Sequence, residues 1–363
     1  MAMNHNDQSD NRAWSLDFSD DFGALENAQS LMPQPQGRLC AGLVLITHGF
    51  NAGFVGEPEW MSAMQNAMIK RIGANAKIGR IHVSQAQNRN DKGLALSIEW
   101  ENRYDDAAYS GGSDCEIFIR VDWTAIANYL LTGISTDVIA SSLAAFLCSP
   151  ASGIYKLKEL PIHLIGHSRG ASLVCELANN LGRTGMTADH VTTLDPHPLT
   201  QNDLQPPGKE PIIDAPVVKH ANIRFMDNYW QSIAYPKGNP VKGAYNRCFS
   251  KLPGAYHFTI HAGFGDHMNI VMAYLATIDL NSPPDTTEAV LKESQREIWF
   301  LPEEEKGAQT GFYFSRTISP ESRPELYDSE SDSKAADDFS DTSSNPEKAS
   351  SFNRISFNVR VAV

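Results

Sequence analysis

Hydrophobic and polar positions follow two alternating periods along the middle of the chain. Short, continuously apolar runs are typical of strands buried on both faces, and apolar residues that recur every three or four positions are typical of helices. The expected strands are residues 43–47, 81–85, 94–100, 117–123, 160–165, 191–194 and 223–226. The expected helices are residues 57–72, 135–147, 171–181 and 267–275. Strands interleaved with helices predict an α/β fold, with a mostly parallel sheet covered by helices on both faces.

The alternation of expected strands and helices is confined to the middle of the chain, which divides the sequence into three regions. Residues 1–38 have no apolar period and are expected to form an irregular arm. Residues 39–282 are expected to form one domain, with a proline-rich insertion at about 197–262. Residues 283–363 are predicted to form a small C-terminal β extension, with a mobile, acidic and serine-rich segment at about 321–351. The β-like runs in this extension are 298–301, 312–314 and 352–363.

A glycine-bounded serine lies between an expected strand and an expected helix. The run Gly166-His167-Ser168-Arg169-Gly170 follows the strand at 160–165 and precedes the helix at 171–181. A strand that enters a helix through Gly-x-Ser-x-Gly predicts a nucleophile elbow, because the tight turn needs glycine on both sides of the serine. Ser168 is therefore expected at the carboxyl edge of the sheet as a nucleophile.

A serine nucleophile needs a base, and in hydrolases of this architecture the base follows the serine along the chain. His267 is favoured because it lies in a glycine-rich loop that opens the last expected helix. His261, in the preceding loop, is the alternative.

The acid that orients such a histidine has two candidates. Asp195 ends the strand after the elbow helix, and the following Pro196 removes a backbone donor and stops further strand pairing. Asp227 ends the next expected strand and is the alternative. Asp195 is favoured because it would project at the carboxyl edge of the sheet.

An acyl-transfer site also needs two backbone donors for the oxyanion. One is expected from Arg169, the residue after the nucleophile, and the other from the loop after the first strand. The segment Thr47-His48-Gly49-Phe50 fits that loop, with Gly49 allowing close approach and Phe50 N–H as the donor.

Composition and charge limit the classes of binding partner and the cellular location that we expect for the protein. The formal charge of −13 argues against nucleic acid and anionic membrane surfaces as partners, because both require basic residues. Five widely spaced cysteines predict buried thiols rather than a disulfide framework. The polar N-terminal stretch has no signal-peptide pattern, and no apolar stretch reaches the length of a membrane span, so a cytoplasmic location is expected. No cofactor or metal is expected.

The motifs at 43–51, 121–123, 164–171 and 194–196 occur in an order that resembles the lipase family typified by pancreatic lipase, within the α/β-hydrolase superfamily. The resemblance covers about residues 41–280. It implies a Ser-Asp-His triad with Asp195 as the acid and Phe50 as an oxyanion donor. The sequence differs from the family in three ways: it has no signal peptide, no disulfide pattern and a divergent C-terminal region. The family's triglyceride substrate is therefore not expected from the resemblance.

The expected activity is hydrolysis of carboxylic esters, small-molecule or lipid, through an acyl-enzyme on Ser168. The alternatives are a phospholipase or polyester hydrolase that uses the same site, and a non-catalytic binding protein on the same scaffold. The oligomeric state is left open.

Overall fold

The fold is centred on one eight-stranded sheet. The computed structural model describes residues 42–51, 56–72, 76–86, 93–101, 116–154, 156–205, 207–208, 210–232, 235–251, 265–279 and 310–324. The N-terminal arm, the alternative base His261, the acidic segment after residue 324 and the terminal β-like run lie outside these residues. None of the helices in the described ranges has the length and apolar character needed to cross a membrane.

All neighbouring strands of the sheet are parallel except one pair. The strand order is β3-β2-β4-β1-β5-β6-β7-β8, and β3 is antiparallel to β2. The strands are β1 (Gly42–Thr47), β2 (Ala76–Gln85), β3 (Leu94–Trp100), β4 (Glu116–Asp122), β5 (Ile162–His167), β6 (Ala188–Leu194), β7 (Ile223–Trp230) and β8 (Tyr245–Cys248). The parallel neighbours of β5 are β1 and β6, so the carboxyl ends of these three strands meet at one edge.

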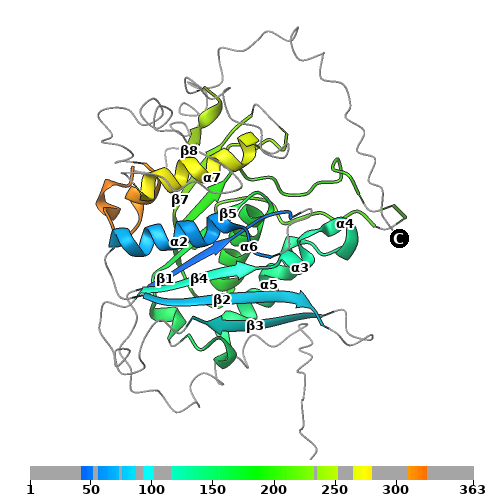
Figure 1. Ribbon diagram of the computed structural model, residues 1–363, viewed down its shortest axis with the longest axis horizontal. Coiled ribbons are helices and arrows are strands. Elements are labelled where there is room, and N and C mark those ends of the chain that lie inside the picture. The colour runs from blue at the N-terminus through cyan, green and yellow to red at the C-terminus, as the bar shows by residue number, and fades with distance from the viewer. Residues whose placement is uncertain are drawn as a thin grey trace, which may run out of the picture.

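Helices cover both faces of the sheet, as Figure 1 shows. The helices are α2 (Glu59–Ile72), α3 (Thr124–Ala127), α4 (Tyr129–Thr132), α5 (Thr136–Cys148), α6 (Arg169–Arg183) and α7 (Gly265–Ile278). Alternate residues of β1 serve the two faces: Leu45 packs in the cluster with α5 and α6, and Ile46 packs in the cluster with α2 and α7. The α/β fold that the sequence predicts, a mostly parallel sheet covered by helices on both faces, is confirmed.

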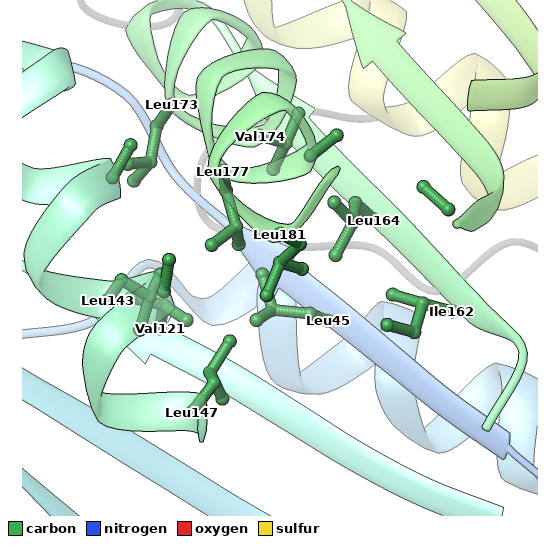
Figure 2. Close-up of a cluster of buried hydrophobic side chains, with 14 of the residues drawn as sticks. Leu45, Val121, Leu143, Leu147, Ile162, Leu164, Leu173, Val174, Leu177 and Leu181 are labelled. Carbon is green, nitrogen blue, oxygen red and sulfur yellow. The ribbon is translucent and has the colours of Figure 1, made fainter. Parts of the chain in front are cut away.

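The core between β1, β5, α5 and α6 consists of interlocking aliphatic side chains (Figure 2). Leu173, Leu177 and Leu181 of α6 recur at the spacing of helical turns, and all are at most 1% exposed. They meet Leu45 and Leu164 of the sheet in one buried cluster. Side chains of this kind each stabilise the fold by about 1.5–3 kcal/mol when buried. The core therefore fixes α6 against the sheet.

A segment from the C-terminal part of the chain, residues 310–324, packs against the sheet and is called the C-terminal strap. Phe312 and Phe314 are buried, and Phe314 contacts the rings of Phe225 and Tyr245 at 5.5 and 5.2 Å. Arg316 pairs with Glu116, the first residue of β4. The strap, orange in Figure 1, thus lies at the amino-terminal side of the sheet.

The ends of the strap meet different strands. Arg323 pairs with Asp189, the second residue of β6, at 2.6 Å.

The expectation of a β-like run at 312–314 is wrong, because Gly311–Phe314 forms a 3₁₀ turn. Its backbone hydrogen bonds are local, from Tyr313 N–H to Thr310 O at 3.2 Å and from Ser315 N–H to Phe312 O at 2.9 Å, whereas a strand would bond to a neighbouring strand.

Candidate active site

Ser168 occupies the turn between β5 and α6, in a backbone conformation that is rare for a residue with a side chain. Its φ is 58° and its ψ is −124°. Such a conformation costs about 1–3 kcal/mol and persists only where the surroundings enforce it. The Ser168 N–H donates to Leu194 O at 2.9 Å, and the Ser168 carbonyl accepts from the N–H of Ala171 and of His197. The nucleophile candidate is therefore held in a strained turn at the carboxyl edge.

Three glycines allow this turn, because the backbone segments around it lie in direct contact. A Cβ on Gly166 would lie 2.1 Å from Gly170 O, and a Cβ on Gly170 would lie 2.3 Å from His48 O. A Cβ on Gly49 would lie 2.5 Å from Ser168 Cβ and 2.9 Å from Arg169 N. The loop after β1 is thus pressed against the elbow, as the motif predicted.

The structure brings His267 and Asp195 together beside the elbow. His267 is the third residue of α7, and its Nδ1–H donates to Asp195 Oδ2 at 2.6 Å. Its ring lies 4.4 Å from the ring of His167, the residue that precedes Ser168. The His167 Nε2–H also donates to the His267 carbonyl at 3.2 Å. With Nδ1 directed at Asp195, the other ring nitrogen, Nε2, is left for a further partner.

Asp195 is fully buried, and its carboxyl group is held by Gln231, the residue that follows β7. Its Oδ1 accepts the Gln231 N–H and its Oδ2 accepts the Gln231 side-chain amide, each at 2.9 Å. A Cβ on Gly238 would lie 2.1 Å from Asp195 Oδ1, so the next loop packs directly on the carboxylate. Burial raises the pKa of Asp195, and hydrogen bonds from Gln231 and Gly238 oppose that rise. The two hydrogen bonds from Gln231 therefore fix the orientation of the Asp195 carboxyl group.

His267 is 4% exposed and neutral at rest. Burial lowers its pKa to about 3, because the charged imidazolium loses hydration in this site. The His167 pKa is also lowered, first by burial and then by the neighbouring His267. A neutral imidazole beside an oriented carboxylate can accept a proton, which is the property that a general base needs.

Asp227, the alternative acid, lies elsewhere in the sheet. It sits in the middle of β7, where its Oδ1 is 2.8 Å from His190 Nε2 and its Oδ2 accepts the Tyr229 hydroxyl at 2.9 Å. His190 in turn stacks on His163 with ring centroids 4.0 Å apart. Asp227 is thus engaged in a buried network, and Asp195 is the carboxylate that contacts His267.

The two expected oxyanion donors lie on segments that meet at the elbow. Arg169 begins α6, and Phe50 follows Gly49, which touches Ser168. The loop carrying Phe50 is fixed by His48, whose Nδ1–H donates to Gly49 O at 2.9 Å. The Trp123 indole N–H donates to His48 O at 2.9 Å. The His48 and Trp123 rings stack at 5.3 Å.

An apolar cluster adjoins these segments. Phe50 lies 5.5 Å from the ring of Tyr129, and both pack with Leu199 and Ile212 from the segment after β6. This cluster combines the loop after β1, helix α4 and the proline-rich segment. It packs these three segments together next to the elbow.

Sequence reasoning missed Gln231, Gly238 and Asp214, which support the candidate residues from irregular segments. A partial signal exists for Gln231, because it directly follows β7 and so lies at the carboxyl edge. Nothing in the local pattern marks Gly238 or Asp214. Within the residues that the structure covers, no group of three or more histidine, cysteine, aspartate or glutamate side chains could hold a metal ion.

Comparisons with known proteins add little to this description. No protein-family model and no curated protein sequence matches the chain. Among solved structures, it is similar to a gene product of Listeria innocua, with 12% identity over 57% of this chain and 74% of the other and a TM-score of 0.31. It is also similar to a proposed cell surface hydrolase of Lactobacillus plantarum, with 13% identity over 72% of this chain and 96% of the other and a TM-score of 0.33.

Proposed function

We propose that this chain is a serine hydrolase that cleaves carboxylic esters, with Ser168 as nucleophile, His267 as base and Asp195 as the acid. The observation that carries the proposal is the 2.6 Å hydrogen bond between His267 and Asp195 beside a serine held at φ 58°. A strained serine on a strand-to-helix turn, with a buried His-Asp pair at the same edge, is the arrangement that acyl transfer needs.

The proposed reaction has two halves. His267 Nε2 takes the Ser168 hydroxyl proton as Oγ attacks the ester carbonyl, and Asp195 stabilises the imidazolium through Nδ1–H. The N–H groups of Phe50 and Arg169 hold the oxyanion. The imidazolium then protonates the leaving alcohol, which departs and leaves an acyl-enzyme. Water, deprotonated by His267, attacks the acyl carbon and releases the carboxylic acid and free Ser168.

Labelling with a fluorophosphonate probe tests the proposal. The native protein should form a covalent adduct on Ser168 and hydrolyse short p-nitrophenyl esters, and Ser168→Ala should do neither. A well-folded native protein that neither labels nor hydrolyses any ester of a graded acyl series would overturn the proposal and favour a non-catalytic binding role.

A second candidate is hydrolysis of esters in aggregated lipid or polymer through the same site. Its support is a set of exposed apolar side chains on α4 and on the segment after β6: Leu131, Leu204 and Ile213 are 74%, 72% and 55% exposed. Exposed apolar side chains of this size favour contact with an apolar surface. The rate on one ester series measured below and above its critical micelle concentration distinguishes the two, because a lipid enzyme accelerates at the interface.

A further inference from the structure

The residue after the proposed nucleophile carries a buried guanidinium that the proposed mechanism does not use. The side chain of Arg169 is 1% exposed, and its partner, the side chain of Asp214, is 0% exposed. Arg169 Nε–H donates to Asp214 Oδ2 and Nη2–H donates to Asp214 Oδ1, each at 2.7 Å. This is the bidentate geometry in which arginine binds a carboxylate most rigidly.

The pair joins three stretches of chain to the elbow. Arg169 also donates to Ala127 O and to Ile134 O, both at 3.0 Å, on either side of α4. Asp214 accepts the backbone N–H of Thr136 at 3.0 Å and of Leu199 at 2.9 Å. The start of α6, the α3–α5 connection and the segment after β6 therefore share one set of charge-assisted hydrogen bonds.

The same guanidinium contacts the support of the other oxyanion loop. Arg169 Cζ lies 5.2 Å from the Trp123 ring. The indole N–H of Trp123 holds His48 O, two residues before Phe50. The residue that supplies one proposed oxyanion donor therefore also contacts, through its side chain and Trp123, the segment that carries the other donor.

We infer that the Arg169 side chain, held by Asp214, is a positioning element that aligns the Arg169 and Phe50 backbone N–H groups on the oxyanion. The inference rests on the proposed function. A buried charge pair can often be replaced by apolar residues without loss of stability, so its place here is explained by geometry rather than by stability. Oxyanion donors act only when they are preorganised at the position that the charge will occupy.

The test uses substitutions that leave both backbone donors in the chain. Arg169→Lys keeps the charge and loses the fork, Asp214→Asn keeps the shape and loses the charge, and the double variant Arg169→Met with Asp214→Leu removes both charges. The matched control is Arg316→Met with Glu116→Leu, which removes a partly buried pair at the other end of the strands. Folding of each variant is checked by circular dichroism and by thermal melting.

We expect kcat on a p-nitrophenyl ester to fall by about 10–100-fold in all three elbow variants, with KM changed by less than about threefold, because misaligned donors lose transition-state binding. Inhibition by a trifluoromethyl ketone, which forms an oxyanion on Ser168, should weaken in proportion to kcat/KM. The control should keep kcat and inhibition within about twofold of wild type.

Three results would overturn the inference while the proposed function stands: unchanged kcat in a folded Asp214→Asn, a raised KM with unchanged kcat, or trifluoromethyl ketone inhibition that stays constant as kcat falls. Should Arg169→Lys and the double variant fail to fold, Asp214→Asn alone decides. A wild-type protein without esterase activity or probe labelling is a failure of the proposed function instead.

Discussion

Two buried histidine–aspartate pairs, one beside the sheet and one within it, have similar contact distances and different surroundings. His267 and Asp195 are joined at 2.6 Å, and His190 and Asp227 at 2.8 Å. The first pair lies beside Ser168 at the carboxyl edge. The second lies within β6 and β7, where His163, Thr192 and Tyr229 surround it and the C-terminal strap packs on the same network.

The comparison shows that contact distance and burial do not distinguish the proposed catalytic pair from the second pair. Burial lowers the histidine pKa in both pairs and raises the aspartate pKa in both. What separates them is position along the strands, because parallel strands present reactive groups only beyond their carboxyl ends. The two pairs should therefore respond in opposite ways to the same substitution.

The largest effect is expected at Asp195. Asp195→Asn should lower kcat by about 10⁴-fold with the fold intact, because the amide no longer fixes the tautomer of His267 or stabilises its charged form. Steady-state ester hydrolysis and circular dichroism of the purified variant check this. A loss of less than about tenfold would remove Asp195 from the proposed triad.

A smaller loss is expected when Asp195 is displaced without being replaced. In Gly238→Ala the new Cβ would lie 2.1 Å from Asp195 Oδ1, and Gln231 restrains the carboxylate, so the His267 hydrogen bond should lengthen. We expect kcat to fall by about 10–100-fold. The control is Gly93→Ala, whose Cβ would meet nothing within 4 Å. Equal activity in the two variants would contradict the prediction.

The second pair should matter for stability and not for turnover. Asp227→Asn should lower the free energy of unfolding by about 1–3 kcal/mol, because His190 and Tyr229 lose a charged acceptor in a dry site. Urea unfolding measures this, and kcat/KM should stay within about threefold of wild type. A loss of turnover comparable to that of Asp195→Asn would instead make Asp227 the acid.

The smallest effect is expected in the pH dependence of the free energy of unfolding. His163, His167, His190 and His267 have pKa values lowered by burial, so the unfolded chain binds protons below pH 6.5 that the folded protein does not. As the pH is lowered below 6.5, the free energy of unfolding should therefore decrease, by up to about 1.4 kcal/mol per pH unit for each histidine.

Asp227 acts with the opposite sign. Burial raises its pKa from 3.8 to about 6, so between those values the folded protein holds a proton that the unfolded chain lacks. Its contribution to stability grows as pH falls through about 6. In Asp227→Asn this offset is absent, so the acid-side slope of the unfolding free energy should be steeper by up to about one proton. Identical slopes in urea titrations from pH 7 to 4.5 would contradict this.

Local pattern was sufficient for the parts of the site that a short segment defines. Ser168 is recognisable because the tight turn demands Gly166 and Gly170, and each of these indeed faces backbone at under 2.5 Å. The α/β architecture follows from the two apolar periods in the same way. The placement of His267 was inferred from chain order and the helix after it, and the structure puts this histidine against Asp195.

The supporting residues could not be predicted because their partners are remote. Asp214 reaches Arg169 from 45 residues away and Gln231 reaches Asp195 from 36 residues away, both from segments without apolar periodicity. Strand β8, with four residues, and helices α3 and α4, with four residues each, are too short to produce a period. The roles of Ser168, Asp195, His267, Phe50 and Arg169 in turnover stay predictions.

The C-terminal strap has a consequence for how the molecule reaches its final state during synthesis. Phe312 and Phe314 complete the packing around strands β7 and β8, which are made well before the strap: Tyr229 and Gly311, for example, are 82 positions apart. Domains fold as their residues leave the ribosome, beginning at the amino end. Packing on that side of the sheet can therefore be completed only once the strap has emerged.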